Sequence, residues 1–271
     1  MRKMRIWIGI LAIALASIGL AGEELAEYTI TKKNAKVLDQ LIQAARKDDA
    51  RTMAGLIRYP LHRSYPVPPV RNANEMVQRF HHVFDRALIS KIASSSVYEN
   101  WHPVGWRGIM LNQGDVWADY DGYVFVINYV SELESRLQKH LILLEKQKLH
   151  PSLRDYEEPV LIARDNRRII RIDLDKSGYR YAAWPAGSKQ SQKPELIIEG
   201  GSIDVQGTMR YHTYEFKSGS YSYAFEVDDA QLLVFQEDAE ILKSKMRMVQ
   251  PFKYVSGKFK EKFGNYQLTN F

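Results

Sequence analysis

The sequence predicts an α+β fold, with helices on a curved antiparallel sheet followed by a small all-β sandwich or barrel domain. Two observations support this fold class. Apolar residues recur at helical spacing in three stretches of the first half, within residues 38–57, 76–87 and 133–144. From Pro159 onward, short strand-like runs alternate with turn pairs that contain glycine or asparagine.

The predicted organisation has four parts: a leader (1–22), an α+β domain (28–150), an antiparallel β domain (159–250) and a basic C-terminal tail (251–271). Two domains are expected because a mature chain of roughly 250 residues exceeds the usual single-domain length of ~100–150.

The first 22 residues predict an exported protein. Arg2, Lys3 and Arg5 precede an apolar run, and small residues follow at Ala21 and Gly22, which is the pattern of a secretory signal peptide. The run is shorter than the ~20 residues that a spanning helix needs, so we favour cleavage near Ala21 or Gly22 over a membrane anchor. The chain has no cysteine, so we expect neither a lipoprotein anchor nor a disulfide. The expected location is periplasmic or secreted.

Composition and motifs exclude several classes of function. The net charge is +6, and the leader contributes three cations and no acid, so the mature chain is at +3. This weak positive charge does not indicate nucleic-acid binding. The sequence contains no HExxH pair, no GxSxG turn and no glycine-rich phosphate loop. We therefore expect no cofactor, no metal and no nucleic-acid partner.

Residues 40–63 form the element around which we expect the first domain to be organised. Apolar side chains lie at helical spacing in two pieces: Leu38, Leu41, Ile42 and Ala45, then Met53, Ala54, Leu56 and Ile57. The Asp48-Asp49 pair between them is suited to cap the second helix, and Pro60 ends it. The last two residues of the second set are expected to be buried on the sheet that contains residues 123–130.

A third helix is predicted after residues 64–71, whose three prolines exclude helix. Asn72 is a suitable N-cap, and Glu75 stands where a capping box requires it. The apolar face of this helix would consist of Met76, Phe80, Val83, Phe84 and Ala87.

Strands are predicted at residues 108–111, 116–120 and 123–130. The last two are separated by Asp121-Gly122, a dipeptide favoured in two-residue hairpin turns. Strand 123–130 is apolar on both faces, so we expect it to be central in its sheet.

A long helix is predicted at residues 131–149, with Leu133, Leu137, Leu141 and Leu144 on one face. We favour an ordinary amphipathic helix that packs on its own sheet. The alternatives are a helix that packs on a partner subunit and an arm between the domains. The polar residues 154–159 are predicted to form the linker.

The β domain is expected to contain strands at residues 160–163, 168–174, 179–184, 195–199, 202–205, 209–216, 221–227, 231–236 and 239–249, the last of these being ambiguous with helix. Turns are predicted at Asp165-Asn166, Ser177-Gly178 and Gly200-Gly201. A four-residue loop at 217–220 would pair Phe216 with Tyr221, Tyr214 with Tyr223, and His212 with Phe225.

The tail carries lysines among aromatic residues, at Lys253, Lys258, Lys260 and Lys262. We favour a frayed end. Weak contact with an anionic membrane surface or a partner is the alternative.

Three stretches support a resemblance: residues 56–61 (LIRYPL); residues 108–117 (GIMLNQGDVW) with 125–128 (FVIN); and residues 169–184 (IIRIDLDKSGYRYAAW) with 193–200 (KPELIIEG). Together they resemble a broad set of exported bacterial proteins that pair a cystatin-like, or nuclear-transport-factor-like, α+β domain with a small β domain. The resemblance implies a fold and no catalytic residues.

The candidate binding residues are aromatic or titratable: His81, His82, Asp85, Trp101, Trp117, Tyr123, Tyr214 and Tyr223. The leading hypothesis is a non-catalytic module that binds a small ligand or an envelope protein, as an inhibitor or immunity protein does. The alternative is an enzyme that uses acid–base residues in the cavity of the α+β domain, with candidates His81, His82, Asp85, Asp115 and Asp119.

Overall fold

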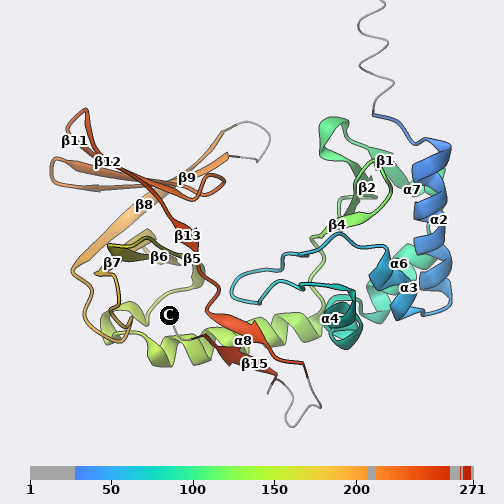
Figure 1. Ribbon diagram of the computed structural model, residues 1–271, viewed down its shortest axis with the longest axis horizontal. Helices are drawn as coiled ribbons and strands as arrows, with labels where there is room; N and C mark the ends of the chain where they lie inside the picture. Colours follow the sequence, from blue (N-terminus) through green and yellow to red (C-terminus); the bar gives the residue numbers. More distant parts are fainter. Residues whose placement is uncertain (1–27, 207–210, 257–262, 264, 270–271) are drawn as a thin grey trace, which may run out of the picture. The chain divides into compact units, whose positions relative to one another are not determined.

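The computed structural model describes residues 28–206, 211–256, 263 and 265–269 (Figure 1). The predicted leader lies outside the described residues. Contacts divide the chain into two compact units, the first comprising Met1–Leu61 and Val70–Ser131, and the second His62–Pro69 and Glu132–Phe271. The predicted mixture of helices and antiparallel sheet is confirmed. The predicted domain boundaries stay predictions.

Unit 1 contains the helices α2 (Lys32–Arg46), α3 (Ala50–Gly55), α4 (Ala73–Gln78), α5 (Phe80–Val83), α6 (Arg86–Ala93) and α7 (Val97–Asn100). The predicted division of the first helical region is confirmed, because the Asp49 side chain accepts a hydrogen bond from the Thr52 amide and caps α3. The helix ends at Gly55, before Pro60 is reached.

The single helix predicted from residue 72 is wrong, because three short helices replace it. Asn72 caps α4 as predicted. Directly after α5, at Phe84 and Asp85, the backbone is extended, and the Asp85 side chain accepts from the Leu88 amide and caps α6. Ala87 is therefore exposed, while Leu88 enters the core.

Glu75 also differs from its predicted role in a capping box. Its carboxylate receives hydrogen bonds from Arg71 and Arg79 at 2.9 and 2.8 Å. The side chain is buried, and a charged acid in that position is stabilised by guanidinium groups.

The sheet of unit 1 is antiparallel, in the order β1 (Trp101–Pro103), β2 (Ile109–Leu111), β3 (Val116–Ala118) and β4 (Val124–Ile127). The predicted central position of residues 123–130 is wrong, because β4 is the last strand. Its outer edge is covered by the chain after α3, where Ile57 forms a parallel bridge with Val124. Leu56 and Ile57 are buried there as predicted. β4 is buried at Val124 and Ile127, while Phe125 is exposed.

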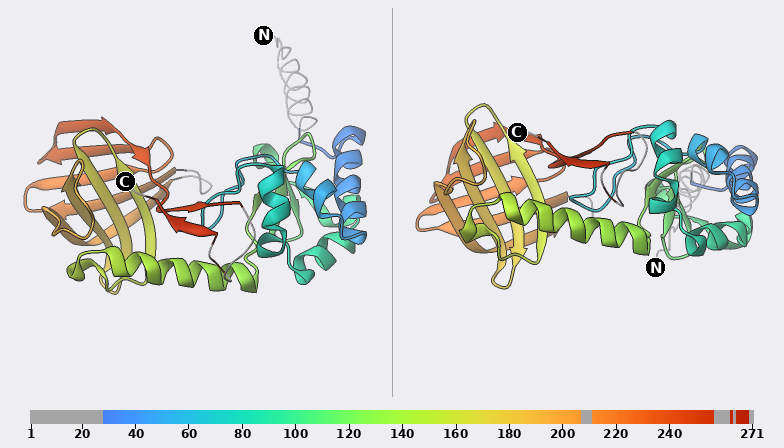
Figure 2. Two further views of the ribbon diagram at one scale, coloured as in Figure 1. Left: turned by 60° about the horizontal axis from the view of Figure 1, so that its bottom comes forward. Right: turned by 90° about the horizontal axis from the view of Figure 1, so that it is seen from below.

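Unit 2 contains a nine-stranded antiparallel sheet: β5 (Glu158–Arg164), β6 (Arg168–Asp175), β7 (Gly178–Pro185), β8 (Leu196–Gln206), β9 (Tyr211–Ser218), β10 (Tyr221–Glu226), β11 (Gln231–Gln236), β12 (Ala239–Lys245) and β13 (Arg247–Met248). Strands β5 to β12 pair in chain order, but β13 pairs with β5 at the opposite edge. Only Met246 separates β12 from β13, so the two edges of the sheet meet there. The sheet is consequently almost a barrel (Figure 2).

The turn predicted at Gly200-Gly201 is wrong, because β8 runs through it. Tyr179 pairs with Gly201 and Tyr181 with Ile198, so one residue of β7 faces two residues of β8. This is a β-bulge, and Gly200 has the positive φ of 71° that such an irregularity tolerates. Gly201 is needed for another reason, because a Cβ there would lie 2.3 Å from the ring of Phe216.

The predicted register of the next hairpin is wrong by two residues. Tyr221 pairs with Ser218, so that Tyr223 faces Phe216 and Phe225 faces Tyr214. The loop therefore has two residues, and Gly219 adopts a φ of 60° in it. The first two residues of the predicted strand 209–216 lie outside the described residues.

Helix α8 (Glu132–Lys148) confirms the predicted long helix, and it packs on elements of its own unit. Leu137 and Leu141 contact the hairpin of β14 (Phe252–Tyr254) and β15 (Tyr266–Leu268), which lies beside α8 in Figures 1 and 2. A frayed end is thus wrong for the paired part of the tail. Lys258, Lys260 and Lys262 lie outside the described residues.

The predicted linker at residues 154–159 is packed in part. Leu153, which ends the short 3₁₀ helix η2 (Pro151–Leu153), and Tyr156 are buried against Ile169 and Trp184 of the sheet. Of the predicted linker, Tyr156 and Pro159 are buried and the other four residues are exposed, and the boundary stays a prediction.

Gly201→Ala is expected to lower the free energy of unfolding by about 1–3 kcal/mol, since the added methyl group overlaps the buried Phe216 ring. Gly55→Ala is the control, because its Cβ would meet no atom within 4 Å. Urea denaturation of the two variants and the wild type measures the difference. Equal stability of Gly201→Ala and the wild type would contradict this account of the bulge.

Candidate functional site

A pocket of about 520 Å³ opens in unit 2 where the two edges of the sheet meet, and we call it the seam pocket. Its lining residues come from the β5–β6 turn, the end of β7 and the β12–β13 junction: Arg164, Asp165, Asn166, Ile169, Ala186, Gly187, Lys245, Met246 and Arg247. Segments distant in sequence thus supply one set of side chains.

Two arginines of the seam pocket face each other across the closing strands. Arg164 on β5 and Arg247 on β13 are direct cross-strand partners. Like charges in that position destabilise a strand pair. Neither guanidinium pairs with a carboxylate within the part of the chain that the structure describes, and Lys245 lies 3.9 Å from Asp229 with both side chains exposed.

The acid in the lining is already engaged. The Asp165 Oδ1 atom accepts from the amides of Arg167 and Arg168, both at 2.7 Å, which closes the β5–β6 turn. Its Oδ2 atom accepts from the Ser244 hydroxyl of β12 at 2.7 Å and so joins the two edges of the sheet. Burial raises the pKa of Asp165, but these hydrogen bonds outweigh it, and the pKa lies below its ordinary value.

The remaining lining consists of the polar Asn166, three apolar residues and a glycine. Ile169 and Met246 are buried side chains at 2% and 6% exposure, and Ala186 and Gly187 complete the lining. The pocket therefore combines cationic groups with an apolar surface, an arrangement that orients a ligand with one charged end.

Sequence reasoning missed this site. One signal was present, since Lys243, Lys245 and Arg247 alternate along one strand and share its face. The position of Arg164 opposite Arg247 follows only from the pairing of β13 with β5.

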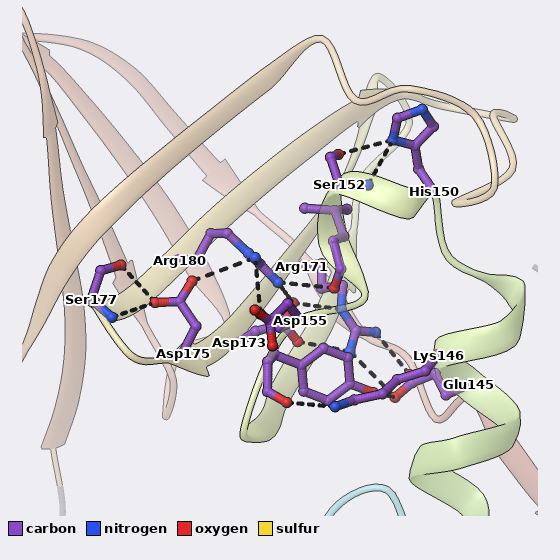
Figure 3. A network of polar contacts seen from close by, with 12 residues as sticks. Glu145, Lys146, His150, Ser152, Asp155, Arg171, Asp173, Asp175, Ser177 and Arg180 are labelled. Carbon is purple, nitrogen blue, oxygen red and sulfur yellow. Dashed lines mark hydrogen bonds and ion pairs between the residues drawn. The ribbon is translucent and has the colours of Figure 1, made fainter.

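A second polar assembly, shown in Figure 3, lies buried between α8 and the outer face of β6 and β7. Arg171 donates to both carboxylate oxygens of Glu145, at 2.8 and 3.3 Å, and through Nε to Asp173 at 3.0 Å. Arg180 donates to the same Asp173 oxygen at 3.3 Å. Tyr156 donates its hydroxyl to Glu145 at 3.1 Å.

The charges of this assembly neutralise one another. Burial lowers the pKa of Arg171, but Asp173 and Glu145 raise it well above its ordinary value. Burial raises the pKa of Asp173, and the two guanidinium groups oppose that shift. The two guanidinium groups contact three carboxylates, those of Glu145, Asp173 and Asp175, so the assembly attaches α8 to the sheet and leaves no excess positive charge for an anionic ligand.

The other end of β6 has a smaller and mostly acidic pocket. Its volume is about 290 Å³, and its acids are Asp155, Glu157, Asp175 and Glu199. An anion would be repelled there, so the two ends of β6 differ in charge.

The two candidate histidines are adjacent on α5 but have different environments. His82 is buried at 8% exposure, and burial, followed by the charges of Arg79 and His81, lowers its pKa to about 4. His81 is exposed and its ring contacts Phe80. The Asp85 carboxylate caps α6 and also accepts the Tyr129 hydroxyl at 2.7 Å.

Two of the acid–base candidates do approach one tyrosine. The Asp85 carboxylate accepts a hydrogen bond from the Tyr129 hydroxyl, and the Asp115 carbonyl accepts one from the Tyr129 amide at 3.3 Å. The hydrogen bond from Tyr129 to Asp85, burial and the charges of both acids raise the pKa of Tyr129 to about 12, so the hydroxyl stays protonated. Lys91 forms an ion pair with Asp115, and Arg58 one with Asp119.

The aromatic candidates are held by local contacts. Trp101 is buried and donates to Ser95, and Trp117 donates to the Gly114 carbonyl. The guanidinium of Arg58 lies over the Tyr123 ring, with its Cζ atom 4.2 Å from the ring centre.

Tyr214 and Tyr223 pack against the core of the curled sheet. Their rings lie 4.8 Å from Tyr179 and 5.5 Å from Tyr181, respectively. Six of the candidates thus belong to unit 1 and two to unit 2.

No family model, curated protein or solved structure matched this chain. The resemblance to exported cystatin-like proteins stays a prediction. Among residues 28–206, 211–256, 263 and 265–269, no helix is long and apolar enough to cross a membrane, and no three histidine or acidic side chains gather as a metal site would require.

Glu145→Gln is expected to lower the free energy of unfolding by about 3–5 kcal/mol, because it breaks a buried pair and leaves Arg171 with less compensation. Glu132→Gln on the same helix is the control, since its pair with Arg136 is exposed and contributes about 0–1 kcal/mol. Urea denaturation measures both. Similar small losses would show that the buried assembly does not hold α8.

The stability of unit 1 is expected to fall as the pH drops from about 6.5 to about 4, by about 2–3 kcal/mol. In this window the unfolded chain protonates His82, whereas the fold keeps it neutral. Denaturation at pH 7 and pH 4.5 measures the loss, and His82→Gln should reduce it while the exposed His81→Gln should not. An unchanged pH dependence in His82→Gln would contradict this assignment.

Proposed function

We propose that this protein is an exported, non-catalytic binding protein that holds a small anionic ligand in the seam pocket. The observation that carries the proposal is the cross-strand pair of Arg164 and Arg247, which lines a pocket of about 520 Å³ and has no carboxylate partner in the described part of the chain. A bound anion would supply the missing negative charge.

The unfavourable charge pair supports binding over a purely structural role. In unit 2 the buried Arg63 and Arg171 have carboxylate partners in Glu134 and Glu145. Arg164 is half-buried and Arg247 exposed, so a ligand from solvent can reach both. At the seam, Asp165 is near but engaged by the turn and by Ser244.

Catalysis receives less support. The acid–base candidates lie in unit 1, and none of them lines the pocket of about 450 Å³ between α2 and the residues before and in α7 of that unit. The lining of the seam pocket combines three cations with apolar residues, a composition that supports binding of a ligand with one charged end.

Thermal melts with small anions test the proposal. We expect at least one of phosphate, sulfate, succinate and citrate, at matched ionic strength, to raise the wild-type melting temperature, because a ligand that binds only the fold stabilises it. Arg247→Gln should melt higher than the wild type without ligand, because repulsion with Arg164 is removed, and should lose the ligand-induced shift.

Arg167→Gln is the matched control, since Arg167 is exposed in the neighbouring turn and does not line the pocket. It should keep the shift. If no anion stabilises the wild type, or if Arg167→Gln and Arg247→Gln behave alike, the proposal fails.

A further inference from the structure

We propose that the ligand of the seam pocket is an organic phosphate, whose phosphate group is bound by Arg164 and Arg247 and whose remainder lies on the wall formed by Ile169, Ala186 and Met246. This inference rests on the proposed function and specifies its ligand. It follows from the charge, the donor geometry and the size of the pocket.

The charge of the pocket suits a dianion. Arg164, Arg247 and Lys245 bring three positive charges to the lining and the ionised Asp165 brings one negative charge, so the net charge is 3 − 1 = +2. A phosphate monoester carries about −1.5 to −2 at pH 7, whereas a single carboxylate carries −1. The dianion neutralises more of the lining.

The donors suit an oxyanion with several equivalent oxygens. A guanidinium presents a planar fork of N–H groups that matches two oxygens of a phosphate. Arg164 and Arg247 are direct cross-strand partners, so both forks project from the same face of the sheet and are close enough to serve one anion. A carboxylate has two oxygens in one plane and satisfies one fork fully.

The cations are held on a closed framework. Ser244 donates to Asp165 across the edges, the Met246 amide donates to the Ala230 carbonyl at 2.7 Å, and the Val249 amide donates to the Ile162 carbonyl at 2.8 Å. These bonds fix the backbone on both sides of Arg247. Pre-arranged donors lose less freedom when a ligand binds.

The size of the pocket indicates that the phosphate belongs to a larger molecule. A volume of about 520 Å³ lies in the range of pockets for organic ligands, ~300–1,000 Å³. Gly187 leaves open space on one side, since a Cβ there would meet no atom within 4 Å. The apolar wall would contact the carbon part of the ligand.

Two sources present this chemistry: a soluble phosphomonoester and the headgroup of an anionic phospholipid. We use glycerol 3-phosphate as the soluble probe and vesicles of phosphatidic acid, with phosphatidylcholine vesicles as the reference. Binding of the soluble probe by calorimetry supports the first source. Sedimentation with phosphatidic acid vesicles, without binding of the soluble probe, supports the second.

Calorimetry at matched ionic strength compares glycerol 3-phosphate with inorganic phosphate, sulfate and succinate. We expect glycerol 3-phosphate to bind tightest, because it adds contact with the apolar wall. Affinity for the phosphate probes should fall between pH 7 and pH 5, since the second phosphate pKa is about 6, whereas affinity for sulfate should not.

Arg164→Gln and Arg247→Gln should each weaken binding of the preferred probe by about tenfold or more, as the loss of a hydrogen-bonded charge does. Arg164→Lys keeps the charge without the fork and should lie between the wild type and Arg164→Gln. Arg167→Gln should change affinity by less than about threefold, as a charge outside the pocket does.

The outcomes separate this inference from the proposed function. If sulfate or succinate binds as tightly as the phosphate probes, and the arginine variants weaken it, the phosphate inference is overturned and anion binding stands. If neither the anions nor the vesicles bind in an arginine-dependent way, both are overturned.

Discussion

The single residue between β12 and β13 is the constraint on which the architecture of unit 2 depends. These strands lie at opposite edges of the sheet, so Met246 alone must span the distance between the edges. A sheet of nine twisted strands meets this condition only when it curls almost closed. The core of apolar side chains then lies inside the curl, and polar strand positions face outward or meet α8.

Helix α8 covers the outer face through charge as much as through apolar contact. Its buried residues include Glu134 and Glu145 beside Leu137 and Leu141. Glu134 pairs with Arg63 at 2.5 Å, and both side chains are 1% exposed. Burying such pairs brings a desolvation cost comparable with the attraction, so their main effect is to specify one position of the helix. Leucines alone would allow the helix to slide or rotate.

The arginines of the seam pocket differ from those beside α8. Where α8 meets the sheet, each buried guanidinium has carboxylate partners, whereas Arg164 and Arg247 face each other where the sheet closes. Closure is secured by Asp165, whose hydrogen bonds reach the turn and β12. Both carboxylate oxygens of Asp165 accept hydrogen bonds from the turn and from Ser244, and neither arginine of the pocket donates to them. Stability of the closure and a positive pocket coexist because separate residues perform the two tasks.

Local patterns in the sequence were sufficient for much of the fold. Helical spacing and caps predicted α3 and α8, and turn chemistry at Asp165-Asn166 and Ser177-Gly178 predicted the β5–β7 meander, because these signals act within a few residues. The break at Asp85 escaped this reasoning, since an extended residue was read as part of a helix face.

The tertiary structure decided the rest. Gly200-Gly201 resembles a turn, but the need to admit the Phe216 ring makes it a bulge. The pocket depends on the meeting of β13 with β5, which lie about eighty residues apart in the chain. Strand order is set by the closure of the whole sheet, and no short-range pattern in the sequence encodes which edges meet.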